Sequence, residues 1–426
     1  MTAPATPSVK KRVVHISDVE GSWARLSTFV DRAAGVYFDK LSRLIVDEDT
    51  IFVFGGDAVD RGPWSRRVIR TLLEAKSRQP DHVVLIGGNR DINKLRLPRE
   101  LNGALPKRAP AEIHALSKPD KLRWIFNHTM GAQPAFDFRQ QELKAEGVDA
   151  SDDAVVASFI ADLLPEHGEH FRFLREAQLA FRHGPTLFVH GGIADEALGH
   201  VPGKARIDDV DEWIAALNAF YRQQLGLYAR EPLLVDMSDP TWLPIVLYQA
   251  PKKGLGRNPE SVVYGRFGSD SWNNPRLPSS SSLRWLKQRG ITRVVVGHTP
   301  CGDVPAVLRG DGLGDDTAVE IVIADNSRGR VDIGTVVSID PDGDVLGVDT
   351  RTRLDDDTEV EVRYRLPRAD KSAIGGVTDD GRLIKAILAD DTALLFRSDE
   401  SFVMRQTSAP LSSLGTLAPP TDPAAP

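Results

Sequence analysis

The chain has 426 residues, of which 41% are apolar and 27% charged, as in an ordinary globular protein. Its formal net charge of -7 argues against a nucleic-acid-binding surface. A single cysteine, Cys301, excludes an internal disulfide framework and fits a reducing compartment. No apolar run approaches the roughly 18 residues of a membrane span, and no apolar segment follows the N-terminal lysines as in a secretory signal. We therefore expect a cytoplasmic protein without nucleic-acid or membrane partners.

The first hundred residues alternate short apolar runs with helical patterns. After a leader at 1–11 that we expect to be disordered, apolar runs at 12–17, 50–54 and 82–86 indicate buried strands. Helical periodicity lies between them, at 23–34 and 65–77. Strand, polar turn and helix in this repeated order favour βαβ units, and therefore a mostly parallel or mixed sheet.

Between about residues 95 and 180 the pattern becomes helical. Apolar residues recur at helical spacing in 122–126, 154–164 and 171–179. We interpret this region as a helical insertion after the third strand. Two roles stay open for it, a cap or lid over a functional site and a plain structural scaffold.

Beyond residue 180 the strands return, and the end of the chain has β character. Strands are expected at 186–189, 293–296 and 319–324, and helices at 210–224 and 282–289. From about residue 334, short apolar runs are separated by Asp-Gly and Asp-Asp turns. The prediction is an α/β main domain over 12–366, a small β unit over 367–407 and a disordered, Pro/Ala/Ser-rich tail over 408–426.

The segment from Gly55 to Gly62, with the sequence GGDAVDRG, concentrates charge in one turn. It follows the strand predicted at 50–54, and its two leading glycines allow the chain to turn sharply there. Asp57 is thereby placed at the carboxyl edge of the sheet, where open α/β sheets bind ligands. Two carboxylates and a guanidinium in one turn are costly unless a metal ion and a phosphate neutralise them.

Other predicted strands also end in side chains of the metal-ligand type. A lone histidine at a strand end is more often structural, but here the pattern recurs at five strand ends. Carboxylate, amide and imidazole groups together suit two divalent cations a few ångströms apart, with a carboxylate such as Asp57 bridging them. The candidate ligands are Asp18, Glu20, Asp57, Asn89, His190 and His298.

In this order the segments resemble the motifs of the calcineurin-like metallophosphoesterases, specifically their phosphoprotein-phosphatase branch. The matching strings are GDAVDRG, GNRD, HGG and GHTP, with MSDP and YGRFG as weaker later matches. The resemblance covers roughly residues 13–326. It implies a sandwich of mixed sheets flanked by helices, here with the helical insertion and the small C-terminal β unit.

The resemblance also implies roles for the individual residues. Asp18 and Asp57 would bind the first metal ion, and Asp57 would bridge to a second ion held by Asn89, His190 and His298. On the substrate side, Arg61 would clamp the phosphate, Asn89 would also contact it, and Arg266 is the candidate second clamp. Asp60 would be a partner of the catalytic group that does not itself bind the metal ions.

Two positions depart from the family pattern. Glu20 stands where the family has a histidine, which makes the first metal site all-oxygen and favours Mn²⁺ or Mg²⁺. The alternative is that Glu20 is no ligand. Arg90 stands where the family has the histidine that protonates the leaving group, and a guanidinium cannot donate a proton at this step. Arg90 would supply fixed positive charge, or would only form an ion pair with Asp60 or Asp91.

The function that follows is hydrolysis of phosphomonoesters by a metal-activated hydroxide. We expect two divalent cations as cofactors, most readily Mn²⁺, with Mg²⁺, Fe and Zn as alternatives. The substrate is open between a phosphoserine or phosphothreonine protein, a small phosphorylated metabolite and a nucleotide phosphoanhydride. A pseudophosphatase that binds without efficient turnover is the rival interpretation.

Overall fold

The structure is a computed structural model that describes residues 10–105, 109–233, 239–268, 274–326, 334–399 and 403–421. Nearly all of the predicted leader, and Met237 and Ser238 of the MSDP string, lie outside these ranges. The strands are β1 (Arg12–Ile16), β2 (Val36–Phe38), β3 (Leu44–Val46), β4 (Thr50–Phe54), β5 (Val83–Ile86), β6 (Ala177–Gln178), β7 (Ala180–His183), β8 (Thr186–Val189), β9 (Arg293–Val296), β10 (Ala306–Arg309), β11 (Glu320–Ile323), β12 (Val336–Ile339), β13 (Val345–Arg353), β14 (Glu359–Pro367), β15 (Leu383–Ile387), β16 (Thr392–Ser398) and β17 (Met404–Pro410).

The α-helices are α1 (Trp23–Arg32), α2 (Ser65–Arg78), α3 (Asn89–Ile92), α4 (Leu97–Leu101), α5 (Lys118–Ile125), α6 (Ala135–Ala145), α7 (Asp152–Asp162), α8 (Glu169–Glu176), α9 (Val210–Arg230), α10 (Leu243–Tyr248) and α11 (Ser280–Gln288). Shorter helical turns are η1 (Asn93–Arg96), η2 (Ala111–Ala115), η3 (Phe126–Met130), η4 (Gly310–Leu313), η5 (Asp315–Thr317) and η7 (Leu411–Ser413).

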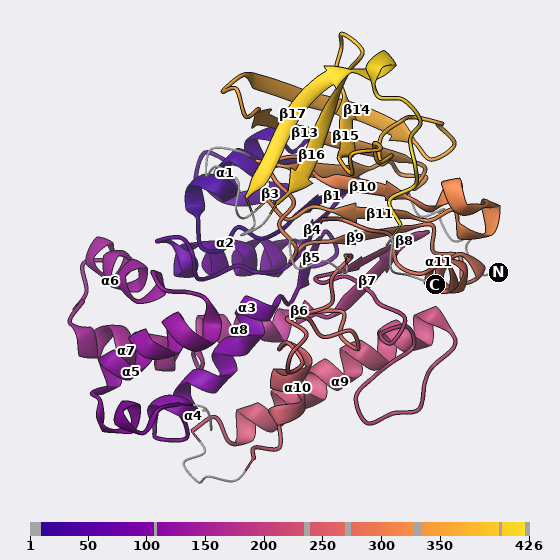
Figure 1. Ribbon diagram of the computed structural model, residues 1–426. Helices are drawn as coiled ribbons and strands as arrows, with labels where there is room; N and C mark the ends of the chain where they lie inside the picture. The colour runs from indigo at the N-terminus through magenta and orange to yellow at the C-terminus, as the bar shows by residue number, and fades with distance from the viewer. Residues whose placement is uncertain are drawn as a thin grey trace, which may run out of the picture.

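Two mixed sheets form the centre of the molecule (Figure 1). The larger has the strand order β14-β13-β12-β1-β4-β5-β6, and its strands β1, β4, β5 and β6 run parallel. The second has the order β10-β11-β9-β8-β7, with β8, β9 and β11 parallel. Parallel neighbours bring their carboxyl ends to the same edge of a sheet, which is where the candidate ligands follow.

Alternate residues of the central strands face two different apolar layers. Val13 and Val53 belong to a layer that also contains Val295 and Val322 of the second sheet, so this layer lies between the sheets. Phe52 and its neighbours on the other face pack against residues of α1 and α2. A strand that is buried on both faces does not alternate apolar with polar residues, which explains the continuous apolar runs in the sequence. The predicted α/β sandwich of mixed sheets flanked by helices is confirmed.

Helices α4 to α7 form a separate layer, which Figure 1 shows in purple, away from the sheets. Helix α8 joins this layer to the sheet side by packing against α2. The layer reaches the candidate site at the carbonyl of Gly131, which accepts a hydrogen bond from Arg90 Nη1 at 3.4 Å. Whether the layer acts as a lid stays a prediction.

The C-terminal strands β15, β16 and β17 form a small sheet of their own that docks on the main domain. The buried Lys385 donates a hydrogen bond to the carbonyl of Cys301, three residues after His298. The prediction of disorder from residue 408 is wrong for 408–421, because β17 runs to Pro410 and Ala418 exchanges backbone hydrogen bonds of 2.8 and 2.9 Å with Val377. Pairing with neighbouring strands overrides the unfavourable local composition.

Candidate metal centre

Each candidate ligand lies just beyond the carboxyl end of a strand. Asp18 and Asp57 follow β1 and β4, and Asn89 opens α3 after β5. His190 and His298 follow β8 and β9 in the other sheet. Since each set of strands runs parallel, the carboxyl edges of the two sheets bring five residues, far apart in sequence, to one place.

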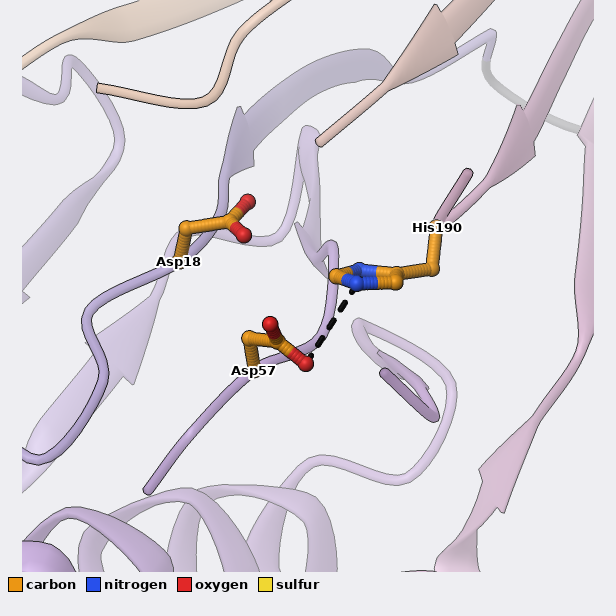
Figure 2. A group of neighbouring side chains, drawn as sticks. All are labelled: Asp18, Asp57 and His190. Atoms are coloured by element: carbon orange, nitrogen blue, oxygen red, sulfur yellow. Dashed lines mark ion pairs between the residues drawn. The ribbon is translucent and has the colours of Figure 1, made fainter. Parts of the chain in front are cut away.

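Three of these residues form a compact group that could hold a metal ion. Asp18, Asp57 and His190 each offer a ligand atom, and these atoms all lie within 4.8 Å of one another (Figure 2). All three side chains are buried. Carboxylate oxygens and an imidazole nitrogen at this spacing are a donor set for a divalent cation.

Asn89 and His298 extend this group on one side. The Oδ1 atom of Asn89 lies 3.1 Å from Nε2 of His190 and 2.8 Å from Nδ1 of His298. Asp57 Oδ1 is 3.3 Å from the same His190 nitrogen. Four side chains therefore direct heteroatoms at one small volume, as the implied second metal site requires.

The hydrogen-bonding chemistry of the two histidines fits a cation. Nδ1 of His190 lies 2.9 Å from the carbonyl oxygen of Gly55, so Nδ1 carries the proton and a neutral ring directs the lone pair of Nε2 at the oxygens of Asn89 and Asp57. A lone pair facing oxygen acceptors is repulsive without a proton or a metal ion between them. The Nε2 atom of His298 is buried and has no hydrogen-bond partner among the described residues, which leaves that ring dependent on a further partner.

The charges in this cluster are unbalanced in the protein alone. Burial, and then the nearby Asp325 carboxylate, raise the pKa of Asp18 well above its usual range. Burial disfavours the charged ring of His190, but the Asp57 carboxylate outweighs it and raises the pKa of His190 to about 10. A proton on His190 thus compensates the buried carboxylates, and a bound cation would replace that proton.

Backbone strain is concentrated at these residues. Asp18, Glu20, Asp57, Asp60 and His298 have φ values of 56°, 48°, 55°, 109° and 64°, in the left-handed region that side chains other than glycine rarely adopt. Each such residue costs of order 1–3 kcal/mol and persists only where the surrounding structure enforces it. Strain of this kind collects at functional sites, so its coincidence with the candidate ligands supports a functional role.

Asp91 holds the Asp57 loop in this conformation. The buried Asp91 carboxylate accepts hydrogen bonds from the backbone amides of Asp57, Ala58 and Gly88 at 2.9, 2.8 and 2.9 Å. Gly88 must be glycine, because a Cβ there would lie 2.2 Å from Oδ1 of Asp57. Burial, and then the Asp57 carboxylate, raise the pKa of Asp91 to about 7.

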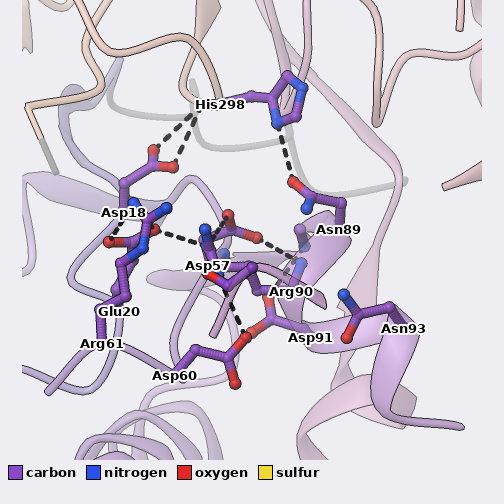
Figure 3. A network of polar contacts seen from close by, with 12 residues as sticks. Asp18, Glu20, Asp57, Asp60, Arg61, Asn89, Arg90, Asp91, Asn93 and His298 are labelled. Atoms are coloured by element: carbon purple, nitrogen blue, oxygen red, sulfur yellow. Dashed lines mark hydrogen bonds and ion pairs between the residues drawn. The ribbon is translucent and has the colours of Figure 1, made fainter. Parts of the chain in front are cut away.

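Glu20 is placed between two guanidinium groups. Its carboxylate lies 2.6 Å from Nε of Arg90 and 3.2 Å from Nη1 of Arg61, and the residue is 2% exposed (Figure 3). It is not part of the candidate metal group of the described residues. In this geometry the Glu20 carboxylate pairs with two guanidiniums, and whether it also binds a metal ion stays a prediction.

Arg90 is buried in a network of carboxylates. Besides Glu20, its guanidinium lies 3.3 Å from Asp60 and 3.5 Å from Asp57. Burial opposes its charge, but these carboxylates, Glu20 first, raise the pKa of Arg90 above its already high usual value, so it stays charged. The expected ion pair with Asp60 is present, whereas Asp91 is occupied by backbone amides. Asp60 is also paired with the buried Lys94 at 2.7 Å.

The two predicted phosphate clamps have different surroundings. The side chain of Arg61 is 32% exposed and lies beside Glu20. Arg266 is partly buried, with its guanidinium 6.0 Å from the ring centroid of Tyr264. The Tyr264 ring in turn lies 4.6 Å from the ring of His298, which connects Arg266 to the metal centre.

Several residues of the site were not singled out from the sequence in the roles that the structure gives them. Asp91, Lys94 and Tyr264 support the candidate ligands or Asp60 through contacts that join distant segments. The GNRD string drew attention to Asp91, but only as a partner for Arg90. Its acidic side chain in the first turn of α3 is the signal that could have indicated its role at the backbone amides.

Comparison with known proteins agrees with this architecture. A model of the calcineurin-like phosphoesterase family matches residues 11–302, which is more than half of the chain. The buried carboxylate and imidazole cluster at the strand ends is thus a candidate metal site in a fold whose family uses divalent metals. The chain belongs to the calcineurin-like phosphoesterase family. A search of curated proteins found no match.

The solved structures to which the chain is similar include phosphatases, at low identity and low TM-score. A cold-active protein tyrosine phosphatase of a psychrophilic Shewanella is 15% identical, with a TM-score of 0.41, over 82% of this chain and 80% of that chain. A protein serine/threonine phosphatase from Saccharomyces cerevisiae is 14% identical, with a TM-score of 0.37, over 85% and 84%. Such distant likeness carries no inference about substrate. No helix in the described ranges is long and apolar enough to cross a membrane.

Proposed function

We propose that the chain is a dinuclear metal-dependent phosphatase, similar to the phosphoprotein-phosphatase branch of its family, that hydrolyses phosphomonoesters. The observation that carries the proposal is a chain of contacts at 2.8–3.3 Å that joins Asp57 to His190, His190 to Asn89 and Asn89 to His298, with Asp18 beside them. Asp18 and Asp57 would hold one cation, and Asp57 with the other three would hold the second. A soluble, cytoplasmic protein is proposed from the single free cysteine, Cys301.

When bound, the two divalent cations supply Lewis acidity, which lowers the pKa of water to near 7 and stabilises charge on phosphoryl oxygens. The chain's own residues orient the ligands. The Gly55 carbonyl fixes the His190 ring, and the three amide contacts of Asp91 fix the loop that carries Asp57. Mn²⁺ is the proposed metal, because the ligands proposed for the first cation, Asp18 and Asp57, are both carboxylates, whose oxygens suit Mn²⁺.

Glu20 is proposed as a positioning residue rather than a ligand. Its carboxylate holds the guanidiniums of Arg61 and Arg90 side by side at the edge of the metal centre. Arg61, being partly exposed, would bind the phosphoryl oxygens directly, since a guanidinium matches phosphate geometry. Arg90 would supply a fixed positive charge, and Arg266, next to Tyr264, would make a second contact with the phosphoryl oxygens.

No described residue at the metal centre is assigned as the acid that protonates the leaving group. Arg90 stays protonated and cannot deliver a proton. His128 of η3 is exposed and stacks on Trp124, with a ring nitrogen 3.0 Å from that residue's carbonyl oxygen, so it is not assigned as the acid. Acidic leaving groups are therefore proposed as the better substrates, which keeps phosphoanhydrides beside phosphomonoesters as substrate classes.

The test separates a phosphatase from a pseudophosphatase. Protein stripped of metal should gain p-nitrophenyl phosphate hydrolysis when Mn²⁺ is added back. Asp57→Asn should lower kcat/KM by at least about 100-fold, since even partners behind a ligand cost 10–100-fold. It should also lose most bound metal, whereas Asp31→Asn, on the exposed face of α1, should match the wild type.

Two results would contradict the proposal. Full metal content in Asp57→Asn would remove the bridging role of this residue. Wild-type protein that binds two equivalents of Mn²⁺ but hydrolyses no phosphate ester would support the pseudophosphatase instead.

A further inference from the structure

A cavity of about 670 Å³ lies next to the metal centre, between the loop after His190 and the start of α11. Its walls include Ile193, Phe267, Leu277 and Pro278 as apolar contacts. This volume is within the range of pockets that enclose small-molecule ligands, roughly 300–1,000 Å³. None of the catalytic roles described above uses this space beyond Arg266.

Four arginines line the cavity, namely Arg257, Arg266, Arg276 and Arg284. Arg257 donates to the carbonyl of Gly268 at 2.8 Å, and Arg276 donates to the carbonyl of Pro275 at 3.0 Å. Neither forms an ion pair with a carboxylate of the described residues. Arg284 lies 3.7 Å from Asp316, and both of these side chains are well exposed, so this pair neutralises little charge.

The acidic residues of the cavity wall do not balance these arginines. Asp195 accepts hydrogen bonds from the hydroxyls of Ser279 at 2.6 Å and Ser281 at 3.2 Å, at the N-terminus of α11. In the described part of the chain, the Asp195 carboxylate therefore interacts with the N-terminus of α11 and not with the arginines. Glu196 is exposed. Among the described residues of the cavity wall, the arginines outnumber the acidic residues, which favours an anionic ligand.

Residues of the cavity wall are neighbours of residues of the metal centre. Gly192, two residues after His190, packs so closely on Arg266 that a Cβ would lie 2.6 Å from the carbonyl carbon of Arg266. Ile193, the next residue, already lines the cavity. Arg266 thus lines the cavity while its neighbour Tyr264 contacts the ring of His298. The wall of the cavity is thus joined to the metal centre through Ile193 on the one side and through Arg266 and Tyr264 on the other.

We propose that this cavity binds a second phosphoryl group of the substrate, so that the substrate is a small molecule with at least two phosphoryl groups. One group reacts at the metal centre, and the other is held by Arg257, Arg276 and Arg284. The inference rests on the proposed phosphatase activity and specifies its substrate class. A small molecule is favoured over a protein because the volume of the cavity is within the range of pockets that hold small molecules.

The experiment compares two probes, adenosine 3′,5′-bisphosphate and p-nitrophenyl phosphate, which has one phosphoryl group. In the Mn²⁺-loaded double variant Arg257→Gln/Arg276→Gln, kcat/KM for the bisphosphate should fall about tenfold or more relative to kcat/KM for p-nitrophenyl phosphate. The reason is that the loss of a hydrogen bond to a charged group lowers affinity by about that factor. Arg397→Gln, an exposed arginine of β16, is the matched control and should keep the wild-type ratio.

An unchanged ratio in the double variant would overturn the inference and leave the proposed phosphatase function standing. A selective loss for a phosphoserine peptide with acidic neighbours, but not for the bisphosphate, would overturn it in favour of a protein substrate. If the double variant does not fold, Arg284→Gln, exposed on α11, provides the same comparison. Equilibrium dialysis measures binding of the bisphosphate to the wild type and to the variant without turnover. Weaker binding to the variant would support the cavity even if the protein proved not to be a phosphatase.

Discussion

Glu20 illustrates how a single substitution changes the design of a metal site at the residue scale. Its carboxylate is buried and lies between Arg61 and Arg90. A buried charge is stable only when it is paired, and here the pairing groups are guanidiniums. The two arginines thereby gain fixed positions at the mouth of the site, which a histidine at this position would not provide.

Glu20→Gln tests this positioning role. Loss of the carboxylate should raise KM for p-nitrophenyl phosphate about tenfold, because Arg61 is no longer held by a charged partner. Bound Mn²⁺, measured by elemental analysis, should stay at the wild-type stoichiometry. Glu74→Gln, which removes an exposed partner of Arg78 on α2, is the control. Loss of one metal equivalent in Glu20→Gln would mean that Glu20 is a ligand after all.

Arg90 gives a second prediction at this scale, because it is a permanent cation in the place of an acid. Without general acid catalysis, a contribution of about 10²–10⁴-fold, wild-type kcat/KM should depend steeply on the pKa of the leaving group. Arg90→His should reduce this slope by raising alkyl phosphate hydrolysis, whereas Arg90→Lys should not. The measurement is log kcat/KM against leaving-group pKa for a series of aryl and alkyl phosphates. A shallow slope in the wild type would show that another group donates the proton.

The candidate ligands could be predicted from the sequence because each follows an apolar strand directly. Asp57 and His190 are examples, since a strand end fixes the position of the next few residues. Side-chain pairs between segments could not be predicted. Glu20 and Arg90 are 70 positions apart, and their 2.6 Å contact depends on how the β1 and β5 loops close over each other. The sequence likewise allowed Asp91 as a partner for Arg90 although backbone amides occupy it.

At the scale of elements, buried parallel strands were the easiest to predict. The strands at 50–54, 186–189 and 293–296 agree with β4, β8 and β9 to the residue. Short strands whose stability comes from a partner were missed, among them the β2–β3 hairpin and β10, which pairs antiparallel with β11. Their local patterns are too short to distinguish from loops, and cross-strand contacts decide their conformation.

One helix-to-sheet contact leads to a prediction at this scale. Asn218 of α9 is buried, and its side chain bonds the amides of Leu179 and Ala180 at 2.9 and 3.1 Å and the carbonyl of Ala180 at 2.9 Å. These residues lie where β6 of one sheet passes into β7 of the other. Asn218→Ala should lower the free energy of unfolding by about 3 kcal/mol or more, since three buried backbone groups lose their partner at roughly 1–3 kcal/mol each.

Urea unfolding measures this effect, and the exposed Asn127→Ala is the control. The folded Asn218→Ala protein should keep the wild-type metal stoichiometry, because the contact is structural. A loss of stability no larger than that of the control would show that water replaces the lost bonds.

At the scale of the whole molecule, the helical layer, the two sheets and the C-terminal unit are joined through buried polar groups. His170 of α8 is one of them. Its Nε2 atom lies 2.9 Å from the backbone carbonyl of Asp91, so it links the helical layer to the loop that supports Asp57. Burial, and then the positive charge of Lys94, lower the pKa of His170 from 6.5 to about 4.

This shift predicts a dependence of stability on pH. His170 stays neutral in the folded protein, whereas in the unfolded chain it binds a proton below pH 6.5, so acid favours unfolding. Its contribution is complete above pH 6.5 and is lost as the pH falls towards about 4. Between pH 7 and pH 5 the wild type should lose about 2 kcal/mol of unfolding free energy through this residue.

His170→Gln keeps a hydrogen-bond donor for the Asp91 carbonyl but cannot titrate. In urea unfolding of metal-free protein at pH 7 and pH 5, the variant should lose about 2 kcal/mol less than the wild type between the two pH values. Other groups that titrate in this range, Asp91 among them, contribute to both proteins and cancel in the comparison. His128→Gln, on the surface of the helical layer, should follow the wild type. Parallel losses in His170→Gln and the wild type would mean that the pKa of His170 is not lowered in the folded protein, so that the charged ring donates its hydrogen bond to the carbonyl of Asp91.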